Sequence, residues 1–420
     1  MRRLLGIVAA AGVLTAGVSA TLPMFAEPEP LPVLRNGADW TQRAPFSAGH
    51  LGSELLRPVL DRAWLVRGRV PGGAEMAPVV TRALLDLRHL TRPNGAVAAG
   101  PDGPWALAWP RDCSFVASAY AVSGHVEDAW AVLGFLGSVQ GADGGFEARY
   151  LLSGAGPPDA RPRQSDGAGW VLWAMDRTRG ESGQRTVPAS LYPLRDRAVG
   201  FILRLTDDGR NLPPVSPDYW EVRERRLTLG TAAPLAAGLD AAARMYAAEG
   251  LAGRATRIHA AAVRLRARIV EHFGPDYQRH GDSGGLDASV AMLMPPFATE
   301  DTASAKAWIA YPALALRRAG GIAPGVQWKQ DGVSWTPETA LVAYTAAASG
   351  RVDVARQWVD WLTAHRTEWG SLPEKVLPDG RPAGPAPLAW TSALVVLTEH
   401  ELDVRRSSAG LEIGAATPDQ

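Results

Sequence analysis

Glu221 and Glu374 carry carboxyl groups that could act together as an acid and a base. Glu221 follows Trp220 and Glu374 follows Pro373, so each carboxylate stands beside a bulky or rigid residue at the edge of an apolar helical stretch. Hydrolysis of a sugar bond requires two carboxyl groups that face each other across that bond. A single glutamate is usually a solvated surface charge, so the pair gains meaning only from the segments around it.

A tryptophan-rich segment earlier in the chain adds groups that could hold a sugar. Trp109 precedes Pro110, which suits the first position of a helix, and Arg111 and Asp112 then fall in the first helical turn. An adjacent arginine and aspartate can donate to and accept from neighbouring sugar hydroxyls. The alternative interpretation of this pair is a structural ion pair that caps the helix.

Other candidates lie where loops meet helices. Gln164 and Asp166 begin the helix that follows the double-glycine turn, although Asp166 could equally be the cap of that helix. The chain has 15 Trp against 8 Phe. An indole offers a flat apolar face and one N–H donor, which suits stacking on a sugar ring. The aromatic candidates at loop-to-helix junctions are Trp109, Trp220, Trp335 and Trp390.

Composition excludes several classes of protein. The 420 residues carry 43 Lys+Arg and 43 Asp+Glu, and this zero net charge argues against a nucleic-acid binder. The eight histidines are scattered, without metal-ligand spacing, so the sequence predicts no metal and no cofactor. Cys113 is the single cysteine, so no intrachain disulfide can form. No segment identifies a protein partner.

The N-terminal segment predicts export. Residues 1–26 contain a basic start, an apolar run and small residues at two candidate cleavage sites, as in a signal peptide. The protein would then be secreted or associated with the cell envelope; an uncleaved membrane anchor is the alternative. No later segment predicts an integral membrane domain. We further predict a Pro-rich linker over 27–45, one catalytic domain over 46–405 and a flexible tail over 406–420.

Apolar periodicity predicts an all-α fold. Groups such as Leu235, Leu239, Ala242 and Tyr246 fall on one helix face. Alternating short and long links favour a ring of helical hairpins, with the long loops gathered at one face. The predicted helices lie near residues 48–65, 75–90, 111–123, 126–138, 167–178, 188–205, 231–249, 253–272, 286–294, 302–318, 337–349, 353–365 and 388–403.

In their order, these segments resemble the glucoamylase-like glycoside hydrolases of family 15. The resemblance rests on Trp-Pro-Arg-Asp at 109–112, Gln-Ser-Asp-Gly at 164–167, Trp-Glu at 220–221, Leu-Asp-Ala-Ser at 286–289, Pro-Glu at 373–374 and Pro-Leu-Ala-Trp at 387–390. It covers about residues 75 to 403. The resemblance implies an (α/α)6 barrel that hydrolyses α-glucosidic bonds from a non-reducing end with inversion.

The resemblance also implies roles for individual residues. Glu221 would be the general acid that protonates the leaving oxygen, and Glu374 would be the general base that activates water. Arg111 and Asp112 would hold the terminal sugar, with Trp109 and Trp220 lining the pocket. The substrate would be an oligosaccharide or polysaccharide.

One departure from the family bears on the substrate, and two other functions stay open. Many glucoamylases have a second glutamate directly after the acid, whereas Val222 stands there in this chain. This favours short oligosaccharides or an envelope glycan over starch-like chains. The alternatives are a non-catalytic sugar-binding or cell-envelope scaffold protein on a hydrolase fold, and another α/α-barrel enzyme such as a terpene cyclase. The sequence contains no Asp-x-Asp-Asp motif, which argues against a terpene cyclase.

Overall fold

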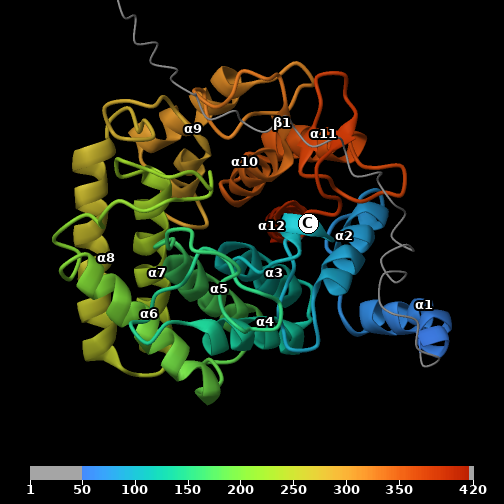
Figure 1. Ribbon diagram of the computed structural model, residues 1–420, viewed down its shortest axis with the longest axis horizontal. Coiled ribbons are helices and arrows are strands. Elements are labelled where there is room, and N and C mark those ends of the chain that lie inside the picture. The colour runs from blue at the N-terminus through green and yellow to red at the C-terminus, as the bar shows by residue number, and fades with distance from the viewer. Residues whose placement is uncertain (1–49, 416–420) are drawn as a thin grey trace, which may run out of the picture.

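Two concentric rings of helices build the domain. The computed structural model describes residues 50–415, with twelve α-helices among them, so the predicted signal peptide and linker lie outside the described residues. Figure 1 shows the helices arranged around a common centre. This is the all-α, (α/α)6 barrel that the sequence predicted.

Inner and outer helices alternate along the chain. The inner ring consists of α3 (Pro110–Val122), α5 (Gly167–Glu181), α7 (Leu229–Ala248), the 3-10 helix η4 (Ala288–Leu293), α10 (Thr336–Ala348) and α12 (Ala389–Ala415). The outer ring consists of α2 (Ala77–Leu90), α4 (Val126–Val139), α6 (Tyr192–Leu205), α8 (Ala252–Phe273), α9 (Thr302–Ala315) and α11 (Val352–Ala364). Helix α1 (His50–Arg67) and the short 3-10 helices η2 (Gly103–Trp105) and η3 (Ala189–Leu191) lie beside these rings.

Burial separates the two rings. Every residue of α3 is buried, because this helix packs against neighbours on all sides. Outer helix α8 instead buries one stripe, which includes Ile258, Leu265 and Ile269, as expected for an amphipathic surface helix. Inner helices rich in alanine and glycine can approach closely. The side chain of any residue other than glycine at 169 would meet the Pro234 carbonyl of α7.

An aromatic cluster fills the centre of the barrel. Phe115 from α3 lies 5.1 Å from Trp170 and 5.0 Å from Trp173, measured between ring centroids. Phe297, which follows η4, lies 5.2 Å from Trp173 and 5.9 Å from Tyr344 of α10. Burial of such large rings contributes strongly to stability. The cluster therefore joins the inner helices α3, α5 and α10 with the segment after η4.

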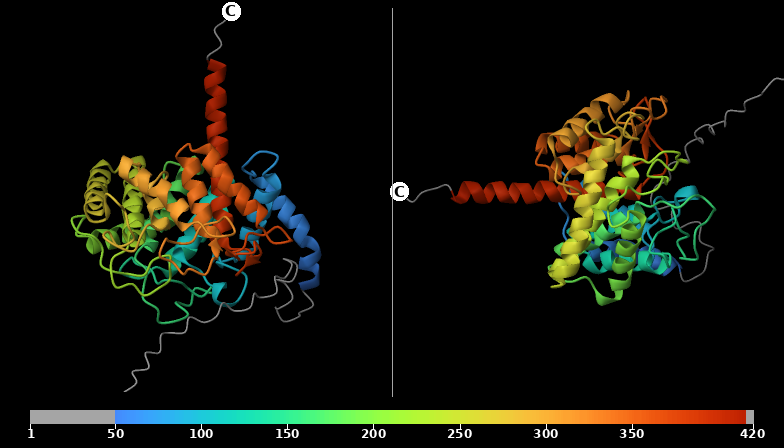
Figure 2. Two further views of the ribbon diagram at one scale, coloured as in Figure 1. Left: turned by 90° about the horizontal axis from the view of Figure 1, so that it is seen from above. Right: turned by 90° about the vertical axis from the view of Figure 1, so that its left-hand side faces the viewer.

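Some elements differ from the sequence prediction. Residues 286–294 were predicted as an α-helix, but the structure has the 3-10 helix η4 there, after Asp287 caps its start through Ser289. Helix α12 runs to Ala415, beyond the predicted domain end at 405, and it projects from the body of the barrel in Figure 2. Within residues 50–415, no helix combines the length and apolar character required to cross a membrane.

A small sheet was not predicted. Its strands are β1 (Ser334–Trp335), β2 (Lys375–Val376) and β3 (Pro382–Ala383), paired antiparallel in the order β1-β2-β3. The register places Trp335 opposite Lys375. The sheet therefore fixes the segment that carries Glu374 against the start of α10.

Candidate active site

Glu221 and Glu374 line one cavity of about 260 Å³. Its wall is built from the segments that precede or begin the inner helices α3, α5, α7, α10 and α12. The loops at this end of the barrel thus bring together residues that are far apart in the sequence. Of the predicted site residues, Trp109, Arg111, Asp112, Glu221, Trp220, Trp335, Glu374 and Trp390 line this cavity.

The Glu221 carboxylate meets donors from several segments. The Trp109 indole N–H and the Gln164 amide donate to Oε1, at 3.1 and 2.8 Å. Arg161 Nη1 donates to Oε2 at 3.0 Å, and Arg111 Nη1 lies 3.7 Å from Oε1. Gln164 does not line the cavity, so it would act on a ligand there only indirectly, through Glu221.

A strained turn aims the Glu221 side chain. Its φ of 56° lies in the left-handed region that residues other than glycine rarely adopt. The backbone N–H of Glu221 donates to the Asp218 carbonyl at 2.9 Å, and the Trp220 N–H donates to the Asp218 carboxylate at 3.0 Å. Asp218 therefore holds the turn at both its backbone and its side chain.

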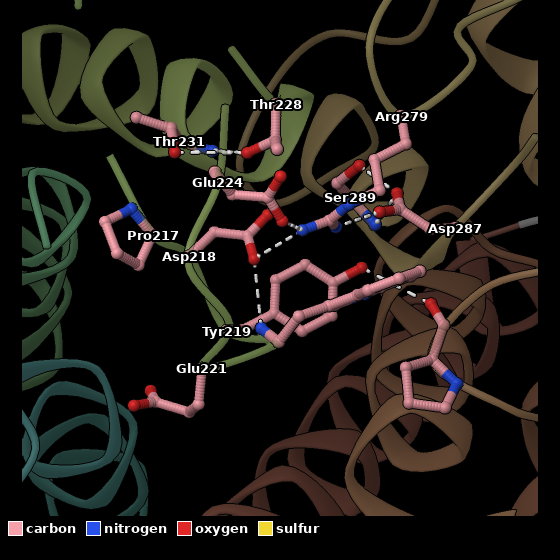
Figure 3. A network of polar contacts seen from close by, with 12 residues as sticks. Pro217, Asp218, Tyr219, Glu221, Glu224, Thr228, Thr231, Arg279, Asp287 and Ser289 are labelled. Atoms are coloured by element: carbon pink, nitrogen blue, oxygen red, sulfur yellow. Dashed lines mark hydrogen bonds and ion pairs between the residues drawn. The ribbon is translucent and has the colours of Figure 1, made fainter. Parts of the chain in front are cut away.

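The buried side chain of Arg279 fixes the position of Asp218. Arg279 Nη2 donates to Asp218 at 2.8 Å and to Glu224 at 2.7 Å, while Nη1 donates to Asp287 at 2.5 Å. Figure 3 shows these carboxylates converging on the guanidinium, with Glu221 pointing away from the network. The Tyr219 hydroxyl donates to the Pro324 carbonyl at 3.4 Å. This network anchors the segment 218–221 to the segment before η4.

Glu374, the second carboxylate of the predicted pair, has different partners. The Trp105 indole N–H donates to Oε1 at 3.1 Å, and Lys375 Nζ lies 3.0 Å from Oε2. The Glu374 N–H donates to the Pro385 carbonyl, which fixes the backbone. A Cβ at Gly384 would lie 2.8 Å from Oε2, so glycine there leaves room for this carboxylate.

Arg111 and Asp112 form a buried ion pair in the first turn of α3, as the sequence predicted for their position. Arg111 Nη2 lies 3.0 Å from Asp112 Oδ2, and the guanidinium lies over the Trp390 ring at 4.5 Å. Arg111 Nε and Nη1 and Asp112 Oδ2 make no hydrogen bond within the described residues. Burial raises the pKa of Asp112. These groups have unused hydrogen-bonding capacity at the cavity wall.

Asp166 lies behind this wall. It is 2% exposed, does not line the cavity and accepts a hydrogen bond from the Trp170 indole at 3.1 Å. Burial raises its pKa to about 7, against the attraction of Arg111. Asp166 precedes α5, but its side chain makes no capping hydrogen bond. Its position favours an electrostatic influence on Arg111 over direct contact with a ligand.

Other residues of the cavity were missed in the sequence analysis. Trp105, Trp328, Arg149, Arg161, Glu338 and Lys375 line it without having been singled out. Glu338 and Lys375 each stand within three residues of a predicted site residue, so proximity in sequence could have suggested them. Nothing in the pattern distinguishes Arg161 from the neighbouring arginines. Among residues 50–415, no group of three or more His, Cys, Asp or Glu could hold a metal ion.

Comparisons with solved structures identify the fold. A glycosidase variant in complex with glucose matches with a TM-score of 0.66 at 22% identity, over 78% of this chain and 96% of that chain. The glucoamylase from Saccharomycopsis fibuligera matches with a TM-score of 0.64 at 12% identity, over 81% and 98%. A bacterial glucoamylase complexed with acarbose matches with a TM-score of 0.65 at 17% identity, over 85% and 59%.

Sequence comparisons add nothing to these likenesses, since no family model and no curated protein matches the chain. The structural matches show that the chain has the fold of glucoamylases and related glycosidases, as predicted from the ordered motifs. At these identities the shared property is the (α/α)6 barrel itself.

Proposed function

We propose that the protein is an inverting glycoside hydrolase that cleaves α-glucosidic bonds at the non-reducing end of oligosaccharides or glycans. Glu221 acts as the general acid and Glu374 as the general base. The observation that carries the proposal is that both carboxylates line one cavity, together with the Arg111–Asp112 pair and several tryptophans. This combination supplies proton transfer, hydroxyl recognition and ring stacking in one place.

Glu221 must be able to reach the leaving oxygen in order to act as the general acid. A general acid must carry a proton when the leaving oxygen departs. In the structure Arg161 and Arg111 both lie close to this carboxylate. The Arg161 side chain is 32% exposed and the Arg111 side chain 8%. Arg161 is therefore the partner that an incoming sugar can displace, which frees Oε2 for the leaving oxygen.

Glu374 is suited to the complementary step. Trp105 and Lys375 place a neutral N–H and a cation against its oxygens, and both stabilise the negative charge that a base requires. A water held by this carboxylate attacks the anomeric carbon from the face opposite the leaving group, which inverts the configuration. Such a mechanism needs roughly 6.5–9.5 Å between the two carboxyls.

Arg111 and Asp112, at the start of α3, bind the terminal sugar. Arg111 Nε and Nη1 make no hydrogen bond within the described residues, and the ion-paired Asp112 carboxylate retains further acceptor capacity. Both match hydroxyl groups, which donate and accept. Trp109, Trp335 and Trp390 add apolar surface around them. The proposal of exo-action rests on this arrangement together with the family resemblance.

Two further parts of the proposal rest mainly on sequence. Val222 stands beside Glu221 and is 39% exposed, so no carboxylate follows the acid to bind a second sugar. We therefore favour short oligosaccharides or an envelope glycan as the substrate. The protein is proposed to be exported because residues 1–26 have the pattern of a signal peptide.

Product stereochemistry tests the proposal directly. Purified protein is incubated with maltose, isomaltose and p-nitrophenyl α-glucoside, and the first product is followed by proton NMR before mutarotation. We expect β-glucose to appear first. Initial release of α-glucose would contradict inversion. A folded protein that hydrolyses none of these substrates, nor an envelope glycan, but still binds glucose would favour the sugar-binding scaffold instead.

A further inference from the structure

Glu338 is a third glutamate in the wall of the cavity. It is the third residue of α10, and it lines the same cavity as Glu221 and Glu374. The residue is 3% exposed. Its Oε2 atom makes no hydrogen bond within the described residues. A buried polar atom without a partner is costly, unless a ligand supplies the partner.

The surroundings of Glu338 keep its proton in place. Burial raises its pKa to about 8, and the nearby Glu374 carboxylate acts in the same direction. The residue's own backbone N–H, Arg111 from α3 and Lys375 from β2 act in the opposite direction but more weakly than burial. Tyr311 from α9 also faces this carboxyl and is itself buried. At neutral pH the side chain therefore carries an O–H donor.

The neighbours of Glu338 indicate what would accept this hydrogen bond. Arg111 offers donors that make no hydrogen bond within the described residues, and the ion-paired Asp112 carboxylate has further acceptor capacity in the same wall. The indole N–H of Trp335, at the β1 end next to α10, also lacks a hydrogen-bond partner within the described residues. Donors and acceptors interleaved with aromatic rings match a polyhydroxylated ring, in which each hydroxyl can serve both roles.

We propose that Glu338 is a sugar-binding residue whose carboxyl O–H donates a hydrogen bond to a hydroxyl of the sugar in this cavity. The inference rests on the proposed function, because it requires a sugar at this site. It separates the three glutamates by role: Glu221 and Glu374 exchange protons with the reacting atoms, whereas Glu338 keeps its proton and recognises the ring.

Binding of D-glucose to the full chain, measured by calorimetry at pH 6 and pH 9.5, tests this role. Wild-type affinity should fall about 5- to 30-fold at the higher pH, since loss of the proton removes a donor and places a charge beside the hydroxyl. Glu338→Gln retains an N–H donor at both pH values, so its affinity should stay within about 3-fold of wild type at pH 6 and change much less with pH.

Two controls isolate the contribution of Glu338 to the binding of glucose. Asp166 also titrates near pH 7, and it is intact in both proteins, so only the difference between their pH responses reports on Glu338. Glu338→Met removes the donor and should weaken glucose binding at pH 6 by about 5- to 30-fold. If this variant does not fold, the comparison of wild type with Glu338→Gln still decides the question.

The outcomes distinguish the inference from the proposed function. An equal fall in affinity for wild type and Glu338→Gln would overturn the role of Glu338 and leave the glycosidase proposal standing. A wild-type protein that binds no glucose at either pH and hydrolyses no α-glucoside would overturn both.

Discussion

The Arg279 guanidinium lies over the Trp220 indole, with Cζ 3.7 Å from the ring centroid. The same guanidinium bonds the Asp218 carboxylate, which receives the Trp220 backbone N–H. Arg279 therefore holds both the ring and the backbone of the residue before Glu221. This relationship connects a buried ion network with the orientation of the proposed acid.

Replacement of Arg279 should destabilise the whole domain. Arg279→Met leaves Asp218, Asp287 and Glu224 buried without their common cation, so we expect a loss of about 3–5 kcal/mol in the free energy of unfolding. Urea unfolding followed by tryptophan fluorescence measures it. Arg268→Met is the matched control, because the Arg268 side chain is 48% exposed and its pair with Glu271 is worth about 0.5 kcal/mol or less. Similar losses in both variants would contradict this assignment.

Removal of the proposed acid should depress turnover in a substrate-dependent manner. Glu221→Gln should lower kcat on maltose by about 10²- to 10⁴-fold, because the amide cannot protonate the leaving oxygen. α-Glucosyl fluoride, whose leaving group needs little protonation, should be affected far less. Glu271→Gln, at a side chain 66% exposed on α8, serves as the control and should leave kcat unchanged. Equal losses on both substrates would argue against an acid role.

Position 169, where α5 contacts α7, should tolerate no residue larger than glycine. A Cβ at Gly169 would lie 2.1 Å from the Pro234 carbonyl oxygen, and Gly238 of α7 approaches the same point. Gly169→Ala should therefore cost at least about 1–3 kcal/mol of unfolding free energy. Gly180→Ala, in the same helix but with nothing within 4 Å, should be neutral or gain up to about 1 kcal/mol. Thermal unfolding of both variants decides this, and a stable Gly169→Ala protein would show that the helices can separate.

Sequence patterns predicted the fold well where periodicity is strong. Helix α8 was expected at 253–272 and lies at Ala252–Phe273, since one apolar stripe repeats along its length. The segment at 286–294 was predicted as one of the helices of an all-α fold, and the structure has the 3-10 helix η4 there, because so short an apolar segment does not reveal its period. The strands β1, β2 and β3 are two residues each, too short to show alternation.

Prediction of the site depended on position rather than on residue type. The first-turn location of Arg111 and Asp112 followed from Pro110 and was confirmed by the start of α3. Arg161 could not be singled out, because its contact with Glu221 arises from the path of a loop. The burial of Glu338 likewise depends on how α10 packs, which a single sequence does not reveal. The catalytic roles of Glu221 and Glu374 stay predictions.

Buried carboxyls should make the protein less stable as pH rises. Burial raises the pKa of Glu399, which is 3% exposed on α12, to about 7. The folded state therefore keeps a proton that the unfolded state loses above about pH 4.5, and the stabilising effect present below that pH disappears as pH rises to 7.

Glu399→Gln removes this titration while it preserves the neutral shape. The unfolding free energy of the variant minus that of wild type should increase by roughly 1–3 kcal/mol from pH 4.5 to pH 8. Urea unfolding at both pH values measures the change. Glu271→Gln is the exposed control and should track wild type, while Asp166 and Glu338 titrate alike in all three proteins and cancel from the comparison. A Glu399→Gln protein whose stability follows wild type at both pH values would show that the folded state ionises Glu399 as readily as the unfolded chain does.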